Sequence, residues 1–117
     1  MKILVTGSNG QLGSELKIIS KSYPKLIFHF SDIEEFDITN PTNIDRFFSE
    51  LKPDFLINCA AYTAVDKAQE ESKEAYKLNT MAPGLLALKC LVNDCKMIHI
   101  STDYVFDGES QEPYKED

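Results

Sequence analysis

Short apolar runs alternate with longer amphipathic stretches along the whole chain. The runs have the length expected of strands and occupy residues 2–6, 26–30, 35–38, 54–58 and 97–100. The stretches between them repeat apolar residues at helical spacing over residues 11–21, 39–51 and 72–94. Strands that alternate with helices in this way predict successive βαβ units around a parallel sheet.

Capping and breaking residues refine the predicted helices. Thr39 or Asn40 can cap the second helix, and Pro41 suits its first turn, where a missing amide proton costs nothing. Pro83 should kink or break the third stretch. The apolar residues at helical spacing are Leu12, Leu16 and Ile19 in the first helix, Ile44, Phe47, Phe48 and Leu51 as a buried stripe in the second, and Tyr76, Leu85, Leu86, Leu88 and Leu91 in the third.

Five strands with intervening helices predict one α/β domain over residues 1–117, with a Rossmann-like, doubly wound parallel sheet. The simplest strand order is 3-2-1-4-5, which leaves the fifth strand as an open edge.

Composition and charge exclude several classes of protein. Apolar residues make up 43% and charged residues 26% of the chain, as in soluble globular domains, and no apolar run is long enough to span a membrane. The net charge of −7 disfavours a nucleic-acid partner. Three cysteines without a Cys-x-x-Cys pair, beside two histidines, predict reduced thiols and no metal site. The first predicted strand begins at residue 2 without the pattern of a signal peptide, so a cytoplasmic location is expected.

A glycine-rich loop joins the first predicted strand to the first helix. Gly7, Gly10 and Gly13 form the pattern Gly-x-x-Gly-x-x-Gly, in which tight backbone approach lets amides contact a pyrophosphate. Ser14 stands where a Walker phosphate loop needs lysine, so that alternative fails.

Asp32 follows the second strand at the distance expected of a carboxylate that binds an adenosine ribose. An ordinary acidic turn is the alternative. No lysine or arginine lies between residues 26 and 45 to neutralise a 2′-phosphate, so NAD(H) is favoured and NADP(H) stays open. Asp37 and Ile38 are candidates for contact with the adenine, although a carboxylate at a strand end is more often solvated.

Residues 101–108, Ser-Thr-Asp-Tyr-Val-Phe-Asp-Gly, place hydroxyls, a carboxylate and a phenol directly after the last strand. Open α/β sheets bind their ligands at the carboxyl ends of strands. The sequence alone is equally compatible with a polar turn.

Taken together, the glycine loop, Asp37-Ile38, the segment 58–68 (Asn-Cys-Ala-Ala-Tyr-Thr-Ala-Val-Asp-Lys-Ala), Asn79 and residues 101–108 resemble the extended short-chain dehydrogenase/reductase superfamily. The segments 58–68 and 101–108 are specifically similar to those of dTDP-4-dehydrorhamnose reductases. That resemblance implies NAD(P)H-dependent reduction of the 4-keto group of dTDP-4-dehydro-6-deoxy-L-mannose to dTDP-L-rhamnose. Other sugar-nucleotide epimerases or dehydratases of the superfamily are the alternative.

The resemblance also implies roles for individual residues. Thr102 matches the hydroxyl of the catalytic triad. Residues implied at the sugar site are Val65, Asp103 and Tyr104. Residues implied at the cofactor are Gly7, Asn9, Gly10, Gln11, Leu12, Gly13, Asp32, Asp37, Ile38, Ala60, Ala61, Thr63 and Asn79.

The superfamily's Tyr-x-x-x-Lys pair does not occur within these 117 residues, because no tyrosine has a lysine four positions later. The expectation is that the chain is the cofactor-binding, amino-terminal part of a larger enzyme, incomplete relative to the family and inactive alone. A free-standing, non-catalytic regulatory or interaction module is the alternative. The resemblance also leaves open a homodimer and a magnesium ion.

Overall fold

The computed structural model describes residues 1–64, 67, 70–101 and 109–114. In this part of the chain a parallel sheet of four strands has the order β2-β1-β3-β4. The strands are β1 (Lys2–Thr6), β2 (Ile27–Phe30), β3 (Phe55–Asn58) and β4 (Lys96–His99). The predicted α/β, Rossmann-like sheet is confirmed, and its four observed strands have the predicted relative order.

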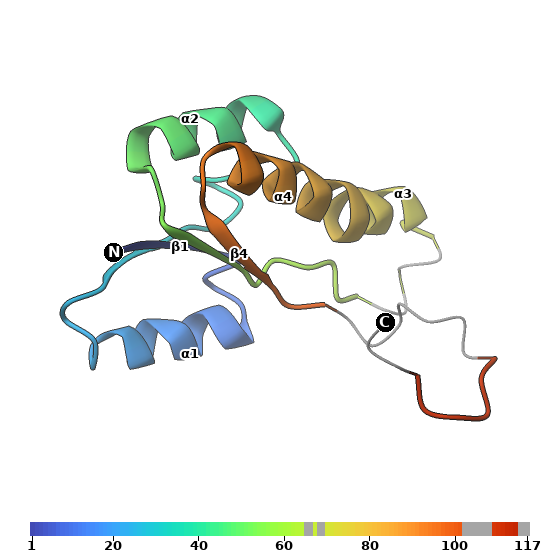
Figure 1. Cartoon of the computed structure of the whole chain (residues 1–117). Coiled ribbons are helices and arrows are strands. Elements are labelled where there is room, and N and C mark those ends of the chain that lie inside the picture. The colour runs from blue at the N-terminus through green and yellow to red at the C-terminus, as the bar shows by residue number, and fades with distance from the viewer. Residues whose placement is uncertain (65–66, 68–69, 102–108, 115–117) are drawn as a thin grey trace.

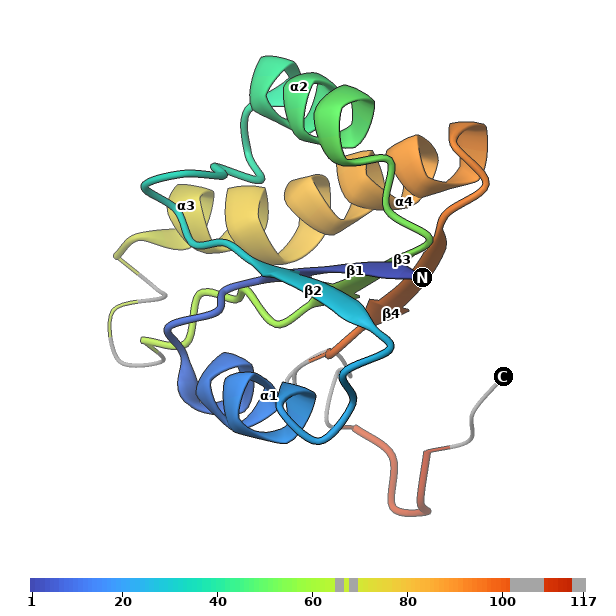
Figure 2. The ribbon, with the colours of Figure 1, turned by 90° about the vertical axis from the view of Figure 1, so that its left-hand side faces the viewer.

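Helices cover the two faces of the sheet unequally (Figures 1 and 2). Helix α1 (Gln11–Ser20) lies alone on one face. Helices α2 (Pro41–Leu51) and α4 (Ala82–Val92) lie on the other, where α3 (Ser72–Tyr76) and a π-helical turn, η2 (Lys77–Met81), lead into α4. No helix in the described ranges is long and apolar enough to cross a membrane.

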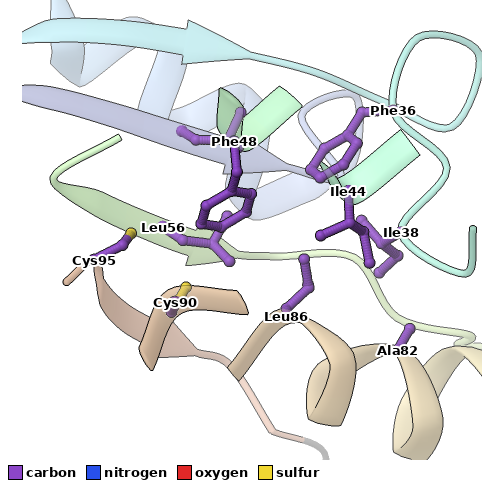
Figure 3. Close-up of a cluster of buried hydrophobic side chains, with 10 residues drawn as sticks. Phe36, Ile38, Ile44, Phe48, Leu56, Ala82, Leu86, Cys90 and Cys95 are labelled. Atoms are coloured by element: carbon purple, nitrogen blue, oxygen red, sulfur yellow. The ribbon is translucent and has the colours of Figure 1, made fainter. Parts of the chain in front are cut away.

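The main core fills the space between the sheet and helices α2 and α4 (Figure 3). Leu4 and Leu56 of the sheet are fully buried there. They pack in one cluster with Phe48 of α2 and Leu86 of α4. The cysteines Cys90 and Cys95 also lie in this cluster as free thiols, while Cys59 is a half-buried free thiol outside it.

The predicted strand at residues 35–38 is wrong. The amides of Glu35 and Phe36 donate to the carbonyl of Asp32, so this segment forms turns rather than a sheet ladder. Phe36 and Ile38 are nevertheless buried, at 2% and 4% exposure, because the segment lies over the core. Two buried residues at alternating positions therefore imitated the pattern of a strand.

Local signals at the start of α2 are confirmed for Asn40 rather than Thr39. The Asn40 side-chain oxygen accepts from the amides of Thr42 and Asn43, at 3.0 and 3.3 Å, and Pro41 occupies the first helical position. In the predicted stripe of α2, Ile44 and Phe48 are buried, and Phe47 and Leu51 pack beside them.

The expected break near Pro83 is present as a change of helix type. The π-helical turn ends at Met81, and regular α4 begins at the next residue. Proline cannot donate a backbone hydrogen bond inside a helix, and a widened turn just before it accommodates that loss.

The apolar residues of the first and third helical stretches are only partly buried. Leu12 and Ile19 of α1 are 40% and 49% exposed. In α4, Leu86 is fully buried, whereas Leu88 and Leu91 are 60% and 78% exposed. Helical spacing thus identified the helices without showing which of their apolar residues reach the core.

Candidate functional site

The glycine loop leaves β1 at Gly7 and enters α1 at Gln11, and close backbone contacts require two of its glycines. Gly7 has a positive φ of 61°, and a Cβ there would lie 2.6 Å from the amide nitrogen of Ala60. A Cβ on Gly13 would lie 2.5 Å from the Gly7 carbonyl oxygen. These two glycines pack the loop against β3 and α1, as the sequence predicts.

Gly10 is different, because a Cβ there would meet only the Gly7 carbonyl oxygen, at 3.3 Å. Gly10 is also the N-cap of α1, and no side chain caps the helix there. The first amides of α1 are therefore available to an anion, which the positive end of the helix dipole would favour.

A pocket of about 290 Å³ opens beside this loop at the carboxyl ends of β1, β2 and β3. Its lining combines backbone from the glycine loop, the acidic turn after β2 and the small residues after β3. The lining residues are Gly7, Asn9, Gly10, Asp32, Ile33, Phe36, Asp37, Ile38, Cys59, Ala60, Ala61 and Leu78. Eight predicted cofactor residues are among them: Gly7, Asn9, Gly10, Asp32, Asp37, Ile38, Ala60 and Ala61.

The Asp32 carboxylate joins the glycine loop to the turn after β2. One oxygen accepts from the Asn9 amide at 2.7 Å, and the other accepts from the Ile33 amide at 2.9 Å. Each carboxylate oxygen can accept more than one hydrogen bond, so acceptor capacity remains for a ligand hydroxyl.

The positively charged side chain of Lys17 lies beside Asn9, whose backbone amide binds the Asp32 carboxylate. The Lys17 ammonium donates to the Asn9 side-chain oxygen at 2.9 Å, while the Asn9 amide binds Asp32. Sequence reasoning missed Lys17, because it searched for cations after β2 rather than in α1.

Asp37 and Ile38 line the pocket, and both also stabilise the fold around it. One Asp37 oxygen accepts from the amide and the hydroxyl of Thr39, at 2.8 and 2.7 Å. Ile38 belongs to the hydrophobic core. Any ligand contact by these residues would therefore come in addition to their role in shaping the turn.

Behind the pocket, a buried amide fixes the ends of three strands. The Asn58 side-chain oxygen accepts from the Thr6 hydroxyl at 2.5 Å and from the Ala60 amide at 3.2 Å. Its amide nitrogen contacts Nδ1 of His99 at 3.0 Å. Sequence reasoning did not identify Thr6 or His99 as parts of the site.

Asn79, predicted as a cofactor residue, holds the segment after β3. Its side-chain oxygen accepts from the Tyr62 amide at 2.7 Å, and its side-chain nitrogen donates to the Tyr62 carbonyl at 3.0 Å. Asn79 is not among the lining residues of the pocket. It thus supports the backbone that follows Ala60 and Ala61.

The Tyr62 side chain forms a second attachment for the same segment. Its hydroxyl donates to the Glu71 carboxylate at 2.5 Å. This hydrogen bond, together with desolvation and the Glu71 charge, raises the pKa of Tyr62 to about 12. A phenol in this state holds its proton tightly, which is the opposite of what a lysine neighbour does to a tyrosine general acid.

The remaining predicted site residues are not gathered in the pocket or lie outside the described residues. Gln11, Leu12 and Thr63 are exposed, and Gly13 is buried by close packing. The four predicted catalytic and sugar-site residues, Val65, Thr102, Asp103 and Tyr104, fall outside the described ranges. Among described residues, no group of three or more His, Cys, Asp or Glu side chains is arranged to hold a metal ion.

Comparison with known proteins places this geometry in a family. The sequence profile described as the RmlD substrate binding domain matches residues 1–117. A dTDP-4-dehydrorhamnose reductase from Burkholderia thailandensis is 41% identical over 116 residues, which are 99% of this chain and 38% of that protein.

Solved structures agree with the sequence comparison. A dTDP-4-dehydrorhamnose reductase from Clostridium acetobutylicum is 46% identical, with a TM-score of 0.91 over 99% of this chain and 41% of its own. The Bacillus anthracis enzyme, solved in complex with NADP, is 36% identical, with a TM-score of 0.85 over 95% of this chain and 39% of its own. This chain thus spans about two fifths of the length of these relatives. It belongs to the RmlD substrate-binding domain family, together with dTDP-4-dehydrorhamnose reductases.

Proposed function

We propose that this chain forms the nicotinamide-dinucleotide-binding part of a reductase for a nucleotide-linked keto sugar. The observation that supports this proposal most strongly is that one pocket joins the glycine loop, Asp32 and the Ala60-Ala61 segment at the carboxyl ends of parallel strands. Its family relatives are dTDP-4-dehydrorhamnose reductases, which supports dTDP-4-dehydro-6-deoxy-L-mannose as the substrate and dTDP-L-rhamnose as the product.

The described residues fit the diphosphate of such a cofactor. A side chain at Gly10 would occupy the space beside the uncapped start of α1, which glycine leaves open. Backbone amides at a helix start bind phosphate without needing arginine. This suits a chain in which Arg46, on α2, is the one arginine.

The ribose end of the pocket contains groups suited to each form of the cofactor. Asp32 can accept from the ribose hydroxyls of NADH. Lys17, held beside Asn9, is the candidate partner for the 2′-phosphate of NADPH. We therefore propose that the site accepts NADPH as well as NADH, which agrees with the NADP found in the B. anthracis relative.

Lys17→Met tests this assignment. Loss of the ammonium should weaken NADPH binding about tenfold, equivalent to about 1.4 kcal/mol, and leave NADH binding nearly unchanged. Fluorescence titration with both cofactors measures the two affinities. Lys21→Met, at the exposed end of α1, is the matched control. Equal effects of Lys17→Met on the two cofactors would contradict the role of this lysine.

The proposed reaction uses residues that follow β3 and β4 in the sequence, at the carboxyl edge of the sheet. When bound, the nicotinamide supplies the hydride that reduces the keto carbon. Ala60, Ala61 and Thr63 would lie near its ribose, where small side chains permit close approach of the backbone. The Thr102 hydroxyl, three residues after β4 ends at His99, would donate a hydrogen bond to the keto oxygen as negative charge develops there.

These 117 residues would bind the cofactor without completing the reaction, since no tyrosine among them has a lysine four positions later to act as the proton donor. Val65, Asp103 and Tyr104 would then line one side of a sugar site whose remainder comes from other residues of a longer enzyme. The expectation is cofactor binding without consumption of NADPH when the keto sugar is added.

Calorimetry with NADPH on the 117-residue chain tests the proposal. Gly10→Val should weaken binding by at least about tenfold, because its methyl groups would occupy the space for the diphosphate. Ser22→Val, on the turn after α1, is the control and should bind like the wild type. Circular dichroism verifies that both variants fold. Equal binding by Gly10→Val and the wild type would rule out this site.

A further inference from the structure

The side chains of Asn58 and His99 meet where β3 and β4 end beside each other. The two residues are partners in the parallel register of these strands. The side-chain nitrogen of Asn58 lies 3.0 Å from Nδ1 of His99. Asn58 is fully buried, whereas His99 is exposed. His99 is therefore the exposed member of the group of hydrogen-bonded side chains behind the pocket.

The backbone determines which end of the Asn58 side-chain amide faces His99. The Ala60 backbone amide can only donate a hydrogen bond, and its nitrogen lies 3.2 Å from the side-chain oxygen of Asn58. The reversed orientation would place the side-chain nitrogen of Asn58 against this amide, so that two donors would face each other. The side-chain nitrogen of Asn58 therefore points toward His99 and donates to it.

This orientation also determines the tautomer of His99. A ring nitrogen that accepts a hydrogen bond carries no proton, so Nδ1 is unprotonated and the N–H of the neutral ring is on Nε2. A proton on Nδ1 would point at the N–H group of Asn58 and break the contact. His99 thus holds Asn58 only as the neutral Nε2–H tautomer.

Two segments of the proposed site begin at this contact. The side-chain oxygen of Asn58 holds the Ala60 amide, at the start of the segment proposed to lie near the nicotinamide ribose. The backbone carbonyl of Asn58 accepts from the Ile100 amide at 3.2 Å, two residues before Thr102. The side chain of His99 thus adds a second link between the ends of β3 and β4.

We propose that His99 is a positioning residue of the cofactor site, which acts on the bound cofactor through Asn58. His99 supplies an acceptor for the buried side-chain nitrogen of Asn58, and a buried donor that loses its partner is destabilising. Asn58, held in this orientation, fixes the Ala60 amide, and Ala60 lines the pocket whereas His99 does not. The inference rests on the proposed function, because it assigns His99 to the nicotinamide end of the same site.

Nitrogen-15 NMR of the imidazole rings in the labelled 117-residue chain tests the tautomer without any cofactor. In mildly alkaline buffer, in which imidazole is neutral, His99 should carry its proton on Nε2 and none on Nδ1. His29, the other histidine of the chain, is exposed on β2 and serves as the reference. A proton on Nδ1 of His99 would overturn the proposal.

His99→Leu and His99→Asn form a matched pair of variants. Leucine removes the acceptor, whereas the side-chain oxygen of asparagine can take the place of Nδ1 and accept from Asn58. His99→Leu should weaken NADPH binding about fivefold, as for one lost hydrogen bond, and speed hydrogen exchange at the Ala60 amide by a similar factor. His99→Asn should recover most of both losses. His29→Leu is the control and should match the wild type in both measurements.

The two measurements separate a failure of this inference from a failure of the proposed function. No binding of NADPH by the wild type would overturn the proposed function, and the role of His99 with it. Normal binding by the wild type, with affinity or Ala60 exchange unchanged in His99→Leu, would overturn the role of His99 alone. Equal losses in His99→Asn and His99→Leu would also overturn it, because the effect would then not depend on a hydrogen-bond acceptor.

Discussion

At the scale of single residues, hydrogen bonds between distant parts of the sequence shape the pocket. Asn58 is fully buried and joins Thr6 of β1, His99 of β4 and the Ala60 amide at the start of the pocket-lining segment. An unsatisfied buried polar group costs about 1–3 kcal/mol, so this amide holds the strand ends in one arrangement.

Asn79→Leu is the sharpest residue-scale test of how the pocket is supported. It removes two hydrogen bonds from the Tyr62 backbone, at 2.7 and 3.0 Å. We expect faster hydrogen exchange at the Tyr62 amide and roughly tenfold weaker NADPH binding, from a loss of about 1–3 kcal/mol. Asn43→Leu, in the first turn of α2 and away from the pocket, should change neither quantity. Unchanged exchange at Tyr62 in Asn79→Leu would contradict the supporting role.

The raised pKa of Tyr62 predicts a dependence of stability on alkaline pH. The folded chain holds the phenol proton to about pH 12, above the ordinary value of 10.0, because the hydrogen bond to Glu71 favours the protonated form. This contribution to stability is complete below pH 10 and disappears as the pH rises toward 12. Denaturant unfolding at several pH values should show a smaller alkaline loss in Tyr62→Phe than in the wild type. Identical dependence of the unfolding free energy on pH in Tyr62→Phe and the wild type would contradict a stabilising role for the Tyr62 proton.

Sequence identified the pocket's glycines and Asp32 because their chemistry depends on local spacing. Gly7 and Gly13 are required by contacts that any Cβ would violate, and such glycines recur at fixed positions in a loop. The partners of Asn58 lie 52 and 41 positions away, so no local pattern could reveal them. Lys17 was missed for a related reason, since it lies eight positions from Asn9 and outside residues 26–45, the segment in which a cation was expected beside the ribose.

At the scale of elements, burial separates residues that share one helical pattern. Leu86 and Leu88 lie two positions apart in α4, yet their exposures are 0% and 60%. The sheet and α2 determine which side of α4 is buried, and neither is visible in the local sequence.

Leu86→Ala and Leu88→Ala form a matched pair of variants. The first should lower the free energy of unfolding by about 2–5 kcal/mol, because it leaves a cavity between the sheet and α4. The second should change it by less than about 0.5 kcal/mol in the monomer. Urea denaturation at low protein concentration measures both. Similar losses in the two variants would mean that the packing of α4 is wrong.

Boundaries and caps of the elements were largely predictable, and the segment 35–38 was not. Asn40 and Pro41 start α2 as their side-chain chemistry requires. By contrast, Phe36 and Ile38 alternate like strand residues because a turn-rich segment presents both to the core. Alternating apolar residues indicate which side chains are buried. They indicate a strand only where the backbone amides are free to hydrogen-bond with a neighbouring strand.

At the scale of the whole molecule, alternation of strands and helices was sufficient to predict a parallel sheet with β1 and β3 at its centre. The uneven cover of its two faces was not predictable, since it depends on how far each helix overlies the sheet (Figure 2). Exposed apolar side chains therefore remain on α1, α4 and β4.

An amide chemical-shift map with NADPH is the most direct test of the proposed function. Addition of NADPH to the isotopically labelled 117-residue chain should shift the amides of residues 9–14, 32–33 and 60–62, which either line the pocket or directly follow its lining residues in the glycine loop, at the start of α1 and after β3. The amides around the separate hollow between β2 and α2, which His29 and Phe47 line, should stay unchanged. Shifts confined to that second hollow, or no shifts at saturating NADPH, would contradict cofactor binding at the glycine loop.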